Sequence, residues 1–263
     1  MDTRAEIIRA EGVSKRFGNQ LAVNNVSYLL RENEVAGIIG SNGAGKTTFF
    51  NLLTGLFPPD AGTILYQGED VTFMTPQQRV ARGLMRTFQL TATFDNLTVI
   101  DNLVLAYFRA YRKPTLLQLL LNTCKSQRND PKIVEALETF DLQGVQDRLV
   151  QHLSLGEKRR LEIAMAVLTE PKVLLLDEPL AGLAESEIQG VLKVLRQHIG
   201  RQTILIVEHK ISHVEDFLER LTVMHEGTVI ADGGCEETLN DPEVRRSYWQ
   251  IGVGEDQDTA ARA

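Results

Sequence analysis

The fold of this chain is decided by Gly40-Ser41-Asn42-Gly43-Ala44-Gly45-Lys46-Thr47, which matches the pattern G-x-x-x-x-G-K-[ST]. The stretch follows the apolar run Val35–Ile39, which predicts a buried strand, and precedes the helix-like run Thr48–Leu53. In this context the glycines let backbone N–H groups turn around phosphate oxygens, and the helix N-terminus adds a favourable dipole. Lys46 supplies a positive charge to the β and γ phosphates, and Thr47 is placed to ligate Mg²⁺. The residues expected to contact the nucleotide are Gly40, Ser41, Asn42, Gly43, Ala44, Gly45, Lys46, Thr47 and Thr48.

A second group of candidate residues follows an apolar run in the last third of the chain. Val173–Leu176 predicts a strand that is buried on both faces, and Asp177 and Glu178 come directly after it. Ligands bind at the carboxyl ends of the strands in parallel sheets. We expect Asp177 to hold the Mg²⁺ shell and Glu178 to polarise an attacking water, since phosphoryl transfer depends on positioning and charge stabilisation.

The hydrophobic pattern changes twice along the chain. Short apolar runs separated by Gly and Asn predict strands in the first third, and apolar residues at helical spacing predict a helical subdomain over residues 97–149. The last third alternates strands with helix-like stretches, which indicates a parallel sheet flanked by helices. The expected strands are Ile7–Ala10, Val26–Leu30, Val35–Ile39, Thr63–Tyr66, Val173–Leu176, Thr203–Val207 and Leu221–Met224, and the late helices are Leu161–Leu168, Glu187–His198 and Ser212–Leu218. Turns are expected at Glu226-Gly227 and Asp232-Gly233, and a last short helix from Asp241-Pro242 to Trp249.

Composition narrows the functional classes. Of the 263 residues 43% are hydrophobic and 24% are charged, as in a globular chain. Lys and Arg total 28 against 35 Asp and Glu, so the formal net charge of −7 disfavours nucleic acid as a partner. Cys124 and Cys235 lack the spacing of a zinc site or a disulfide framework and indicate a reducing compartment. Because no signal-peptide pattern and no run of about 18 apolar residues occurs, we expect neither export nor a membrane span.

A third motif precedes the strand that carries Asp177. Leu153-Ser154-Leu155-Gly156-Glu157 predicts a helix start, since Ser and Glu three residues apart form a capping box. The stretch resembles the LSGGQ signature of ABC-type ATPases, in which this helix N-terminus faces the γ-phosphate of an ATP bound by the opposite subunit. The resemblance implies that Ser154, Gly156 and Glu157 take part in nucleotide binding. It also implies an α/β fold: a P-loop NTPase (RecA-like) core with an antiparallel β subdomain and an α-helical signature-motif subdomain.

Four further residues match landmarks of that family in their order along the chain. By resemblance, Phe17 stacks on adenine and Val23 borders it, while Gln89 touches Mg²⁺ or the attacking water. His209 is expected to contact the γ-phosphate. The resemblance therefore implies Thr47, Gln89 and Asp177 as Mg²⁺ ligands and Glu178, His209 and Gln89 as catalytic residues.

The resemblance covers residues 7–252, and further motifs point to one group of transporters within the family. Arg86-Thr87-Phe88-Gln89, Val207-Glu208-His209 and Asp241-Pro242-Glu243-Val244 look like the ATP-binding subunits of importers for branched-chain or neutral amino acids. Urea and short-chain amide importers have very similar subunits. We expect one ABC ATPase domain over residues 5–252, made of the glycine-loop part of the core with the β subdomain (5–90), the helical subdomain (91–160) and the rest of the core with a C-terminal helix (161–252). Residues 253–263 are expected to form a disordered tail.

The resemblance also implies a working assembly. Two ATP-binding subunits sandwich two ATP molecules, and the second subunit is expected to be a paralogue, so that the pair is a heterodimer. Two multi-span permease subunits would hold the chain at the cytoplasmic face of the plasma (inner) membrane, and a substrate-binding protein would act indirectly. Ala184 departs from the Asp or Asn usual in the family. This departure implies that a polar contact between the subunits is missing. Either the partner subunit compensates for it, or the two ATP sites of the dimer differ in activity.

Three alternatives fit parts of this pattern. An exporter subunit is the nearest alternative within transport. A catalytically silent regulatory subunit would account for Ala184 and for Leu155 and Glu157, which stand where the signature has Gly and Gln. A nucleic-acid-associated ABC ATPase would need a long coiled coil or zinc cysteines between Gln89 and Ser154, and neither is present in the sequence.

Overall fold

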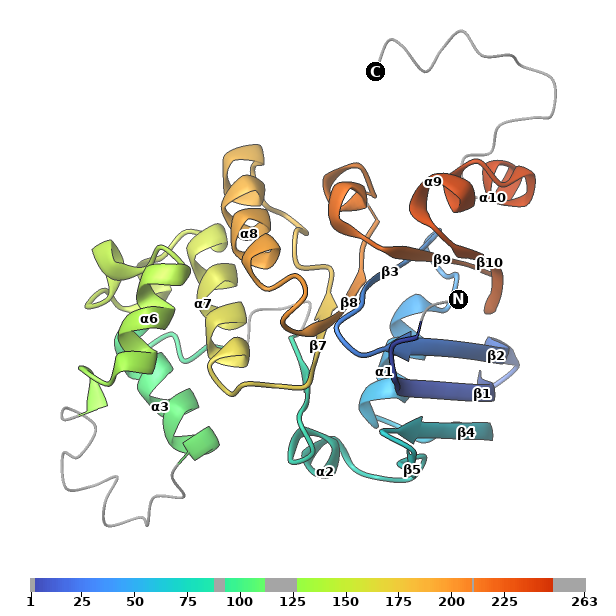
Figure 1. Cartoon of the computed structure of the whole chain (residues 1–263), viewed down its shortest axis with the longest axis horizontal. Coiled ribbons are helices and arrows are strands. Elements are labelled where there is room, and N and C mark those ends of the chain that lie inside the picture. The colour runs from blue at the N-terminus through green and yellow to red at the C-terminus, as the bar shows by residue number, and fades with distance from the viewer. Residues whose placement is uncertain (1–2, 88–92, 112–126, 210, 248–263) are drawn as a thin grey trace, which may run out of the picture.

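A six-stranded sheet forms the centre of the computed structural model, which describes residues 3–87, 93–111, 127–209 and 211–247 (Figure 1). Its strand order is β10-β9-β3-β8-β7-β6. The bounds are β3 Val35–Gly40, β6 Leu84–Arg86, β7 Val173–Asp177, β8 Thr203–Val207, β9 Arg220–His225 and β10 Thr228–Gly233. Four predictions lie wholly or partly outside the described residues: Gln89, residues 112–126 of the expected helical subdomain, the end of the last helix at Trp249 and the tail 253–263.

Five strands of this sheet run parallel, and the predicted alternation of strands and helices is confirmed. β3 pairs in parallel with β8 and β9, and β7 pairs in parallel with β6 and β8. Every residue of β3, β7 and β8 is buried, which is why these strands appear in the sequence as unbroken apolar runs. The glycine loop after β3 and the carboxylates after β7 therefore emerge at the same edge of the sheet.

The edge strand β10 is antiparallel to β9. A two-residue turn joins them at Glu226 and Gly227, with φ of 44° and 80°, as predicted and as a type I′ hairpin requires. The second predicted turn is wrong, because Asp232 and Gly233 lie inside β10. Asp232 is held there by the hydroxyl of Thr222, which donates to Oδ1 over 2.6 Å.

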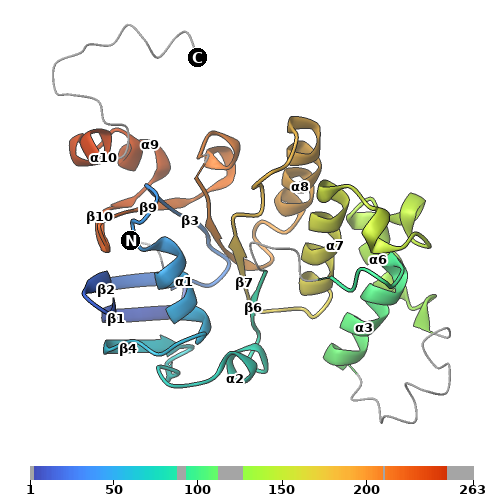
Figure 2. The same cartoon turned by 180° about the vertical axis from the view of Figure 1, so that it is seen from behind.

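A second, antiparallel sheet contains the N-terminal strands in the order β2-β1-β4-β5. Its bounds are β1 Glu6–Phe17, β2 Gln20–Arg31, β4 Ala61–Tyr66 and β5 Glu69–Asp70. Buried residues of this sheet and of α1 form one hydrophobic cluster with β3, β7 and β8. Figure 2 shows α1 against β1 and β2. The antiparallel pairing of β1 with β2 and β4, and of β4 with β5, confirms the predicted antiparallel part of the fold.

Three of the helices form a group beside the six-stranded sheet. α3, α6 and α7 lie together on the far side of the six-stranded sheet from β1, β2 and β4 in both views (Figures 1 and 2). The bounds are α1 Lys46–Thr54, α2 Pro76–Val80, α3 Val99–Tyr111, α6 Pro131–Thr139, α7 Leu155–Val167, α8 Glu185–Gln197, α9 Cys235–Leu239 and α10 Pro242–Ser247. The predicted helix Ser212–Leu218 is wrong, since this segment forms two 3₁₀ turns, Ile211–His213 and Glu215–Phe217. None of the helices in the described part of the chain has the length and apolarity that a membrane span requires.

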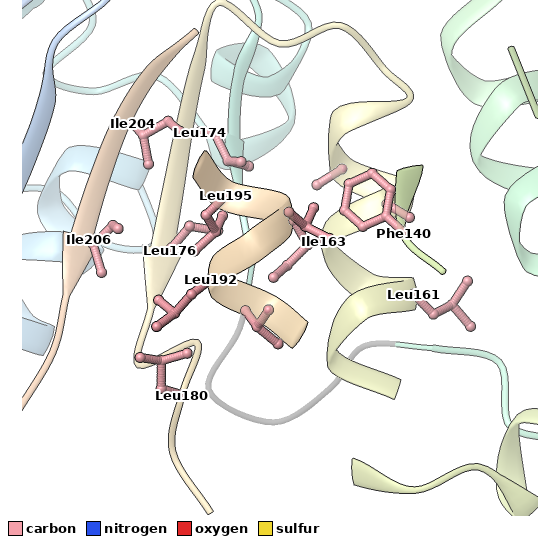
Figure 3. Close-up of a cluster of buried hydrophobic side chains, with 14 of the residues drawn as sticks. Phe140, Leu161, Ile163, Leu174, Leu176, Leu180, Leu192, Leu195, Ile204 and Ile206 are labelled. Carbon is pink, nitrogen blue, oxygen red and sulfur yellow. The ribbon is translucent and has the colours of Figure 1, made fainter. Parts of the chain in front are cut away.

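Helix α8 joins the sheet to the helical region through its apolar face. Leu192 and Leu195 pack against Leu174 and Leu176 of β7 on one side, and Ile163 of α7 lies on the other (Figure 3). Because these residues belong to one buried cluster, the position of α7 relative to the sheet edge is fixed by packing rather than by a linker.

The far end of α1 is held by a buried guanidinium. Arg79 of α2 has 0% exposed surface and donates to the carbonyl oxygens of Leu52 and Leu53 over 2.8 and 2.7 Å. It also donates to the carbonyl oxygens of Val71 and Thr72 over 2.5 and 3.1 Å. Burial lowers the pKa of Arg79 to about 10, so the group remains a cation at neutral pH. The guanidinium thus satisfies the last carbonyls of the helix that begins at Lys46.

Candidate active site

The loop between β3 and α1 is shaped by two glycines that no other residue can replace without strain. A Cβ on Gly45 would lie 2.3 Å from the carbonyl oxygen of Ala22, and the φ of Gly45 is 95°. A Cβ on Gly40 would lie 2.2 Å from the carbonyl oxygen of Met224. The loop therefore packs tightly against β2 and β9 from behind, while Ser41, Asn42 and Gly43 are exposed.

Lys46 opens α1 and folds back over the loop. Its Nζ donates to the carbonyl oxygens of Gly40 and Ser41 over 2.7 and 3.0 Å, and the side chain is buried. Burial lowers the pKa of Lys46, whereas the negative charges of Glu178 and Asp177 raise it. The lysine thus lies in the field of both predicted carboxylates. Thr47 follows on an exposed position of α1, and Thr48 is half-buried.

Asp177 is the last residue of β7 and is buried with 2% exposed surface. Its Oδ2 accepts a hydrogen bond from Arg86 Nη2 over 2.6 Å. Arg86 ends β6, the neighbouring strand, and its guanidinium also contacts the side chains of Asn51 and Thr54 on α1. The carboxylate is therefore oriented by a cation on one side, and its second oxygen can serve as a ligand of a metal ion.

Glu178 and His209 form a second close pair of titratable groups at this edge. Glu178 Oε1 lies 2.8 Å from His209 Nε2, although the residues follow two different strands. The pair is possible because Asp177 of β7 and Val207 of β8 are direct partners in the parallel register. Glu178 is 8% exposed and has a φ of 46°, a left-handed conformation that is uncommon for a residue other than Gly. A carboxylate paired with an imidazole is an arrangement suited to accepting a proton from water.

Phe17 and Val23 differ in their accessibility. Phe17 ends β1 with 47% of its surface exposed and packs edge-on against Phe57, with 5.3 Å between ring centroids. An exposed ring of this kind can stack on a base. Val23 has 0% exposed surface in the cluster between the two sheets. The prediction that Val23 borders adenine is therefore corrected to a packing role, because its side chain offers no surface to a ligand.

The signature residues lie at the N-terminus of α7, apart from the glycine loop. The predicted capping box is confirmed: Ser154 Oγ accepts from the Glu157 N–H over 3.2 Å, and Glu157 Oε2 accepts from the Ser154 N–H over 2.8 Å. Ser154 is exposed and Gly156 is buried. The structure thus brings Lys46, Asp177, Glu178 and His209 together and leaves the signature on another element.

Glu187 connects the signature helix to the next helix, α8. Its Oε1 accepts a hydrogen bond from the Gly156 N–H over 3.0 Å, and its Oε2 accepts one from the Ala184 N–H over 3.1 Å. The hydroxyl of Ser154 and these two N–H groups lower the pKa of Glu187. A Cβ on Gly156 would lie 2.7 Å from Glu187 Cβ, so the approach requires glycine. Ala184 caps α8 without a side-chain hydrogen bond, and Glu187 supplies the carboxylate there.

Three residues of this region were not identified from the sequence as functional. Arg86 entered only as part of a family motif, and Glu187 stood within a predicted helix. Glu208 had the clearest signal, since it directly follows the buried strand Thr203–Val207 as Glu178 directly follows β7.

The oxygen atoms at this edge fit a magnesium ion bound together with phosphate. Mg²⁺ prefers hard oxygen ligands and is usually held by one or two protein groups plus substrate phosphates. Thr47 offers an exposed hydroxyl, and Asp177 offers its second carboxylate oxygen. Over residues 3–87, 93–111, 127–209 and 211–247, no cluster of three His, Cys, Asp or Glu forms a metal cage. The donor set therefore fits Mg²⁺ that arrives with a nucleotide, while Gln89 lies outside the described residues.

A groove separates the sheet edge from the helical region. Its volume is about 500 Å³, and α2, β6, α3 and α7 contribute its walls. Phe94 and Leu56 line it and are each 55% exposed. Arg86 also lines the groove, so the cavity reaches the residue that orients Asp177.

Comparison with known sequences gives consistent matches over nearly the whole chain. A family model described as ABC transporter matches residues 23–181. The chain is 39% identical over 249 residues to the high-affinity branched-chain amino acid transport ATP-binding protein LivG of Salmonella typhimurium, covering 92% of this chain and 97% of that protein. It is 34% identical to BraF of Pseudomonas aeruginosa, which carries the same description, at 92% and 97% coverage. It is 35% identical to the lipopolysaccharide export system ATP-binding protein LptB of Haemophilus influenzae, at 92% and 96% coverage.

Comparison with solved structures agrees. A nucleotide-free ATP-binding cassette from an ABC transporter superposes with a TM-score of 0.77 at 29% identity, covering 94% of this chain and 99% of that one. The ADP conformation of another such cassette has a TM-score of 0.77 at 31% identity, covering 95% and 99%.

Proposed function

Since this chain belongs to the ABC transporter family, as an ATP-hydrolysing subunit, we propose that it energises the uptake of branched-chain amino acids through partner permeases. The observation that carries the substrate class is the similarity to LivG and BraF, which extends over 92% of the chain. The observation that carries the ATPase chemistry is the convergence of Lys46, Asp177, Glu178 and His209 at one sheet edge.

Hydrolysis begins when the glycine loop receives the phosphates of ATP. Lys46 exchanges its hydrogen bonds to the carbonyls of Gly40 and Ser41 for phosphate oxygens, and the N-terminus of α1 faces the same charge. Glu178 then polarises a water for in-line attack on the γ-phosphorus, while His209 keeps the carboxylate oriented and contacts the γ-phosphate. Phe17 stacks on the adenine from the tip of the β1–β2 hairpin.

Mg²⁺ would be held by Thr47 and Asp177, with Gln89 as a further ligand. The ion, when bound, neutralises charge that develops on the phosphate oxygens. The hydrogen bond from Arg86 keeps the Asp177 carboxylate in place for this role. Glu178 would act on the attacking water instead of binding Mg²⁺. Its left-handed backbone, with a φ of 46°, is a conformation that residues of a strand do not adopt.

The proposed assembly contains a second ATP-binding subunit, which we infer to be a paralogue. Ser154, Gly156 and Glu157 would face the γ-phosphate of the ATP bound by that subunit, from the N-terminus of α7. Two multi-span permease subunits would hold the pair at the cytoplasmic face of the plasma membrane, with a substrate-binding protein acting indirectly. The groove of about 500 Å³ beside Phe94 supports this arrangement, because its exposed apolar side chains suit a segment of a permease.

A second candidate is an export system. LptB of Haemophilus influenzae is 35% identical over 92% of this chain. This sequence identity lies between those of BraF, at 34%, and LivG, at 39%. A urea or short-chain amide importer would use the same site, because the transported molecule does not contact this subunit.

The test is purification of the tagged chain from mildly solubilised membranes of its source, followed by mass identification of the accompanying proteins. Two multi-span proteins, a second ATPase and leucine uptake that depends on the chain support the proposal. Recovery with lipopolysaccharide-export components assigns the chain to export instead. Uptake of urea or amides, but not of leucine, assigns the alternative importer class. Recovery without any membrane protein overturns the transport assignment.

A further inference from the structure

Glu208 is a buried carboxylate at the carboxyl edge of the six-stranded sheet. It lies between the last residue of β8 and His209 and has 4% exposed surface. An ionised carboxylate in such a place is strongly unfavourable unless hydrogen bonds compensate the loss of water. Its partners therefore show what the residue does.

The two carboxylate oxygens of Glu208 bind two different segments. Oε1 accepts a hydrogen bond from the Leu180 N–H over 2.8 Å, and Oε2 accepts one from the His209 N–H over 3.2 Å. Leu180 lies two residues after Glu178, in the turn that follows β7. One side chain thus bridges the turn that begins at Glu178 and the segment that carries His209.

The backbone of Glu178 depends on the same bridge. Its φ of 46° is unfavourable for a residue with a side chain, so neighbouring contacts must maintain it. On one side the Glu178 N–H donates to the carbonyl oxygen of Val207 over 2.9 Å. On the other side the turn is held through Leu180 by Glu208. The backbone N–H of Glu208 donates to the carbonyl oxygen of Ile38 in β3 over 3.3 Å. This hydrogen bond connects Glu208 to the strand that precedes the glycine loop.

We propose that Glu208 is a positioning residue for ATP hydrolysis, which keeps Glu178 and His209 at hydrogen-bonding distance by accepting one hydrogen bond from each of their segments. The inference rests on the proposed function, because it assigns a role relative to the Glu178–His209 pair. It does not require contact between Glu208 and ATP.

The electrostatic environment is consistent with a function beyond folding. Burial raises the pKa of Glu208 to about 7, and the charge of Glu178 adds to this increase, whereas the N–H groups of Leu180 and His209 and the charge of Arg159 lower it. Replacing a buried charged group by an apolar residue of similar size is often neutral or stabilising, so the charge of Glu208 is not explained by stability alone. Its two directed hydrogen bonds are what an apolar residue could not supply.

The test is Glu208→Gln, which preserves size but has one acceptor oxygen instead of two, so one of the two N–H groups loses its partner. We expect kcat for ATP hydrolysis to fall by about 10- to 100-fold. KM and the dissociation constant of a fluorescent ATP analogue should change by less than about twofold, because the glycine loop is untouched. Glu208→Asp keeps both oxygens on a shorter side chain and should give a smaller decrease in kcat.

The matched control is Glu34→Gln. Glu34 is also buried, at 2% exposure, and accepts from the Arg31 N–H over 2.8 Å and from Arg220 Nε over 2.6 Å, but it precedes β3 at the opposite end from the glycine loop. It should lower the thermal midpoint without changing kcat. Combining Glu208→Gln with His209→Ala in single-turnover assays should give a rate close to that of His209→Ala alone, since residues that act as a unit are not additive.

The outcomes separate the two proposals. Wild-type protein with no ATPase activity, alone or with its partners, would overturn the proposed function and this inference together. Wild-type activity with an unchanged kcat in Glu208→Gln overturns the inference alone. Equal losses of kcat in Glu208→Gln and Glu34→Gln, or additive losses with His209→Ala, would mean that Glu208 contributes to the fold only.

Discussion

Replacing Arg79 by Met should destabilise the chain through the end of α1. Methionine retains most of the apolar stem but removes the guanidinium, so the carbonyl oxygens of Leu52, Leu53, Val71 and Thr72 lose a donor at 2.5 to 3.1 Å. The carbonyl oxygens of Leu52 and Val71 keep the N–H groups of Gly55 and Met74 as donors, at 3.1 and 2.9 Å, whereas a buried acceptor left without a partner costs about 1–3 kcal/mol. Part of this cost is offset because a charge is no longer buried. We expect a net loss of about 3 kcal/mol in the free energy of unfolding, below the sum of the four contacts.

The assay is urea unfolding followed by circular dichroism, with the slope of the transition checked for two-state behaviour. A loss of about 3 kcal/mol corresponds to a decrease of roughly 6–10 °C in the melting temperature for a domain of this size. Arg82→Met is the matched control, because Arg82 is three residues away on the surface and pairs with the exposed Glu69 over 3.3 Å. That variant should lose less than about 1 kcal/mol. If Arg79→Met also loses less than about 1 kcal/mol, the guanidinium does not secure α1.

Four further expectations concern the site. Lys46→Ala should abolish binding of a fluorescent ATP analogue, because it removes the only lysine in the glycine loop; retained binding would contradict its role. Glu178→Gln should bind ATP normally but lose turnover by at least about 100-fold in a phosphate-release assay, and normal turnover would exclude it as the general base. Ala184→Asp tests whether the missing polar side chain limits one site, and an unchanged ATPase rate in the assembled transporter would show that it does not. The folded-state pKa of Glu208, about 7, lies above its ordinary value, so the stability that protonated Glu208 provides is complete below about pH 4.5 and is lost as pH rises to about 7. Across this interval the wild type should lose about 3 kcal/mol relative to Glu208→Gln, measured as urea unfolding at several pH values, and parallel curves would refute the shift.

The strands of the central sheet could be predicted from sequence because their environment leaves a simple pattern. β3 and β8 are buried on both faces, so Val35–Ile39 and Thr203–Val207 are uninterrupted apolar runs whose limits match the structure within one residue. β6 could not be predicted, since Leu84–Arg86 is three residues long and exists only through pairing with β7. A strand can be predicted from sequence where its burial produces an apolar run. It cannot be predicted where the strand forms only by pairing with a neighbouring strand.

The Asp232-Gly233 pair shows how tertiary contacts override a turn signal. Asp-Gly commonly forms a tight turn, but Asp232 accepts from Thr222 over 2.6 Å and pairs with Arg220 over 2.8 Å. These partners lie on β9 and hold the pair in the extended conformation of β10.

The site was predictable in its composition but not in its connections. The glycine loop and Asp177-Glu178 have sequence patterns that follow from their chemistry. The 2.8 Å contact of Glu178 with His209 depends on the register of β7 and β8 and on the left-handed backbone at Glu178, neither of which has a sequence signature. The hydrogen bonds of Glu187 and Glu208 depend on the same three-dimensional details.

The bridge made by Glu187 has a mechanical consequence. Because one carboxylate binds the N–H groups of Gly156 and Ala184, the N-termini of α7 and α8 share a single anchor. A rotation of α3, α6 and α7 about the sheet must either pull the 178–184 turn with it or break this anchor. The turn begins at Glu178, so any rotation of the helical region that keeps this anchor would be transmitted toward the residue proposed to polarise water.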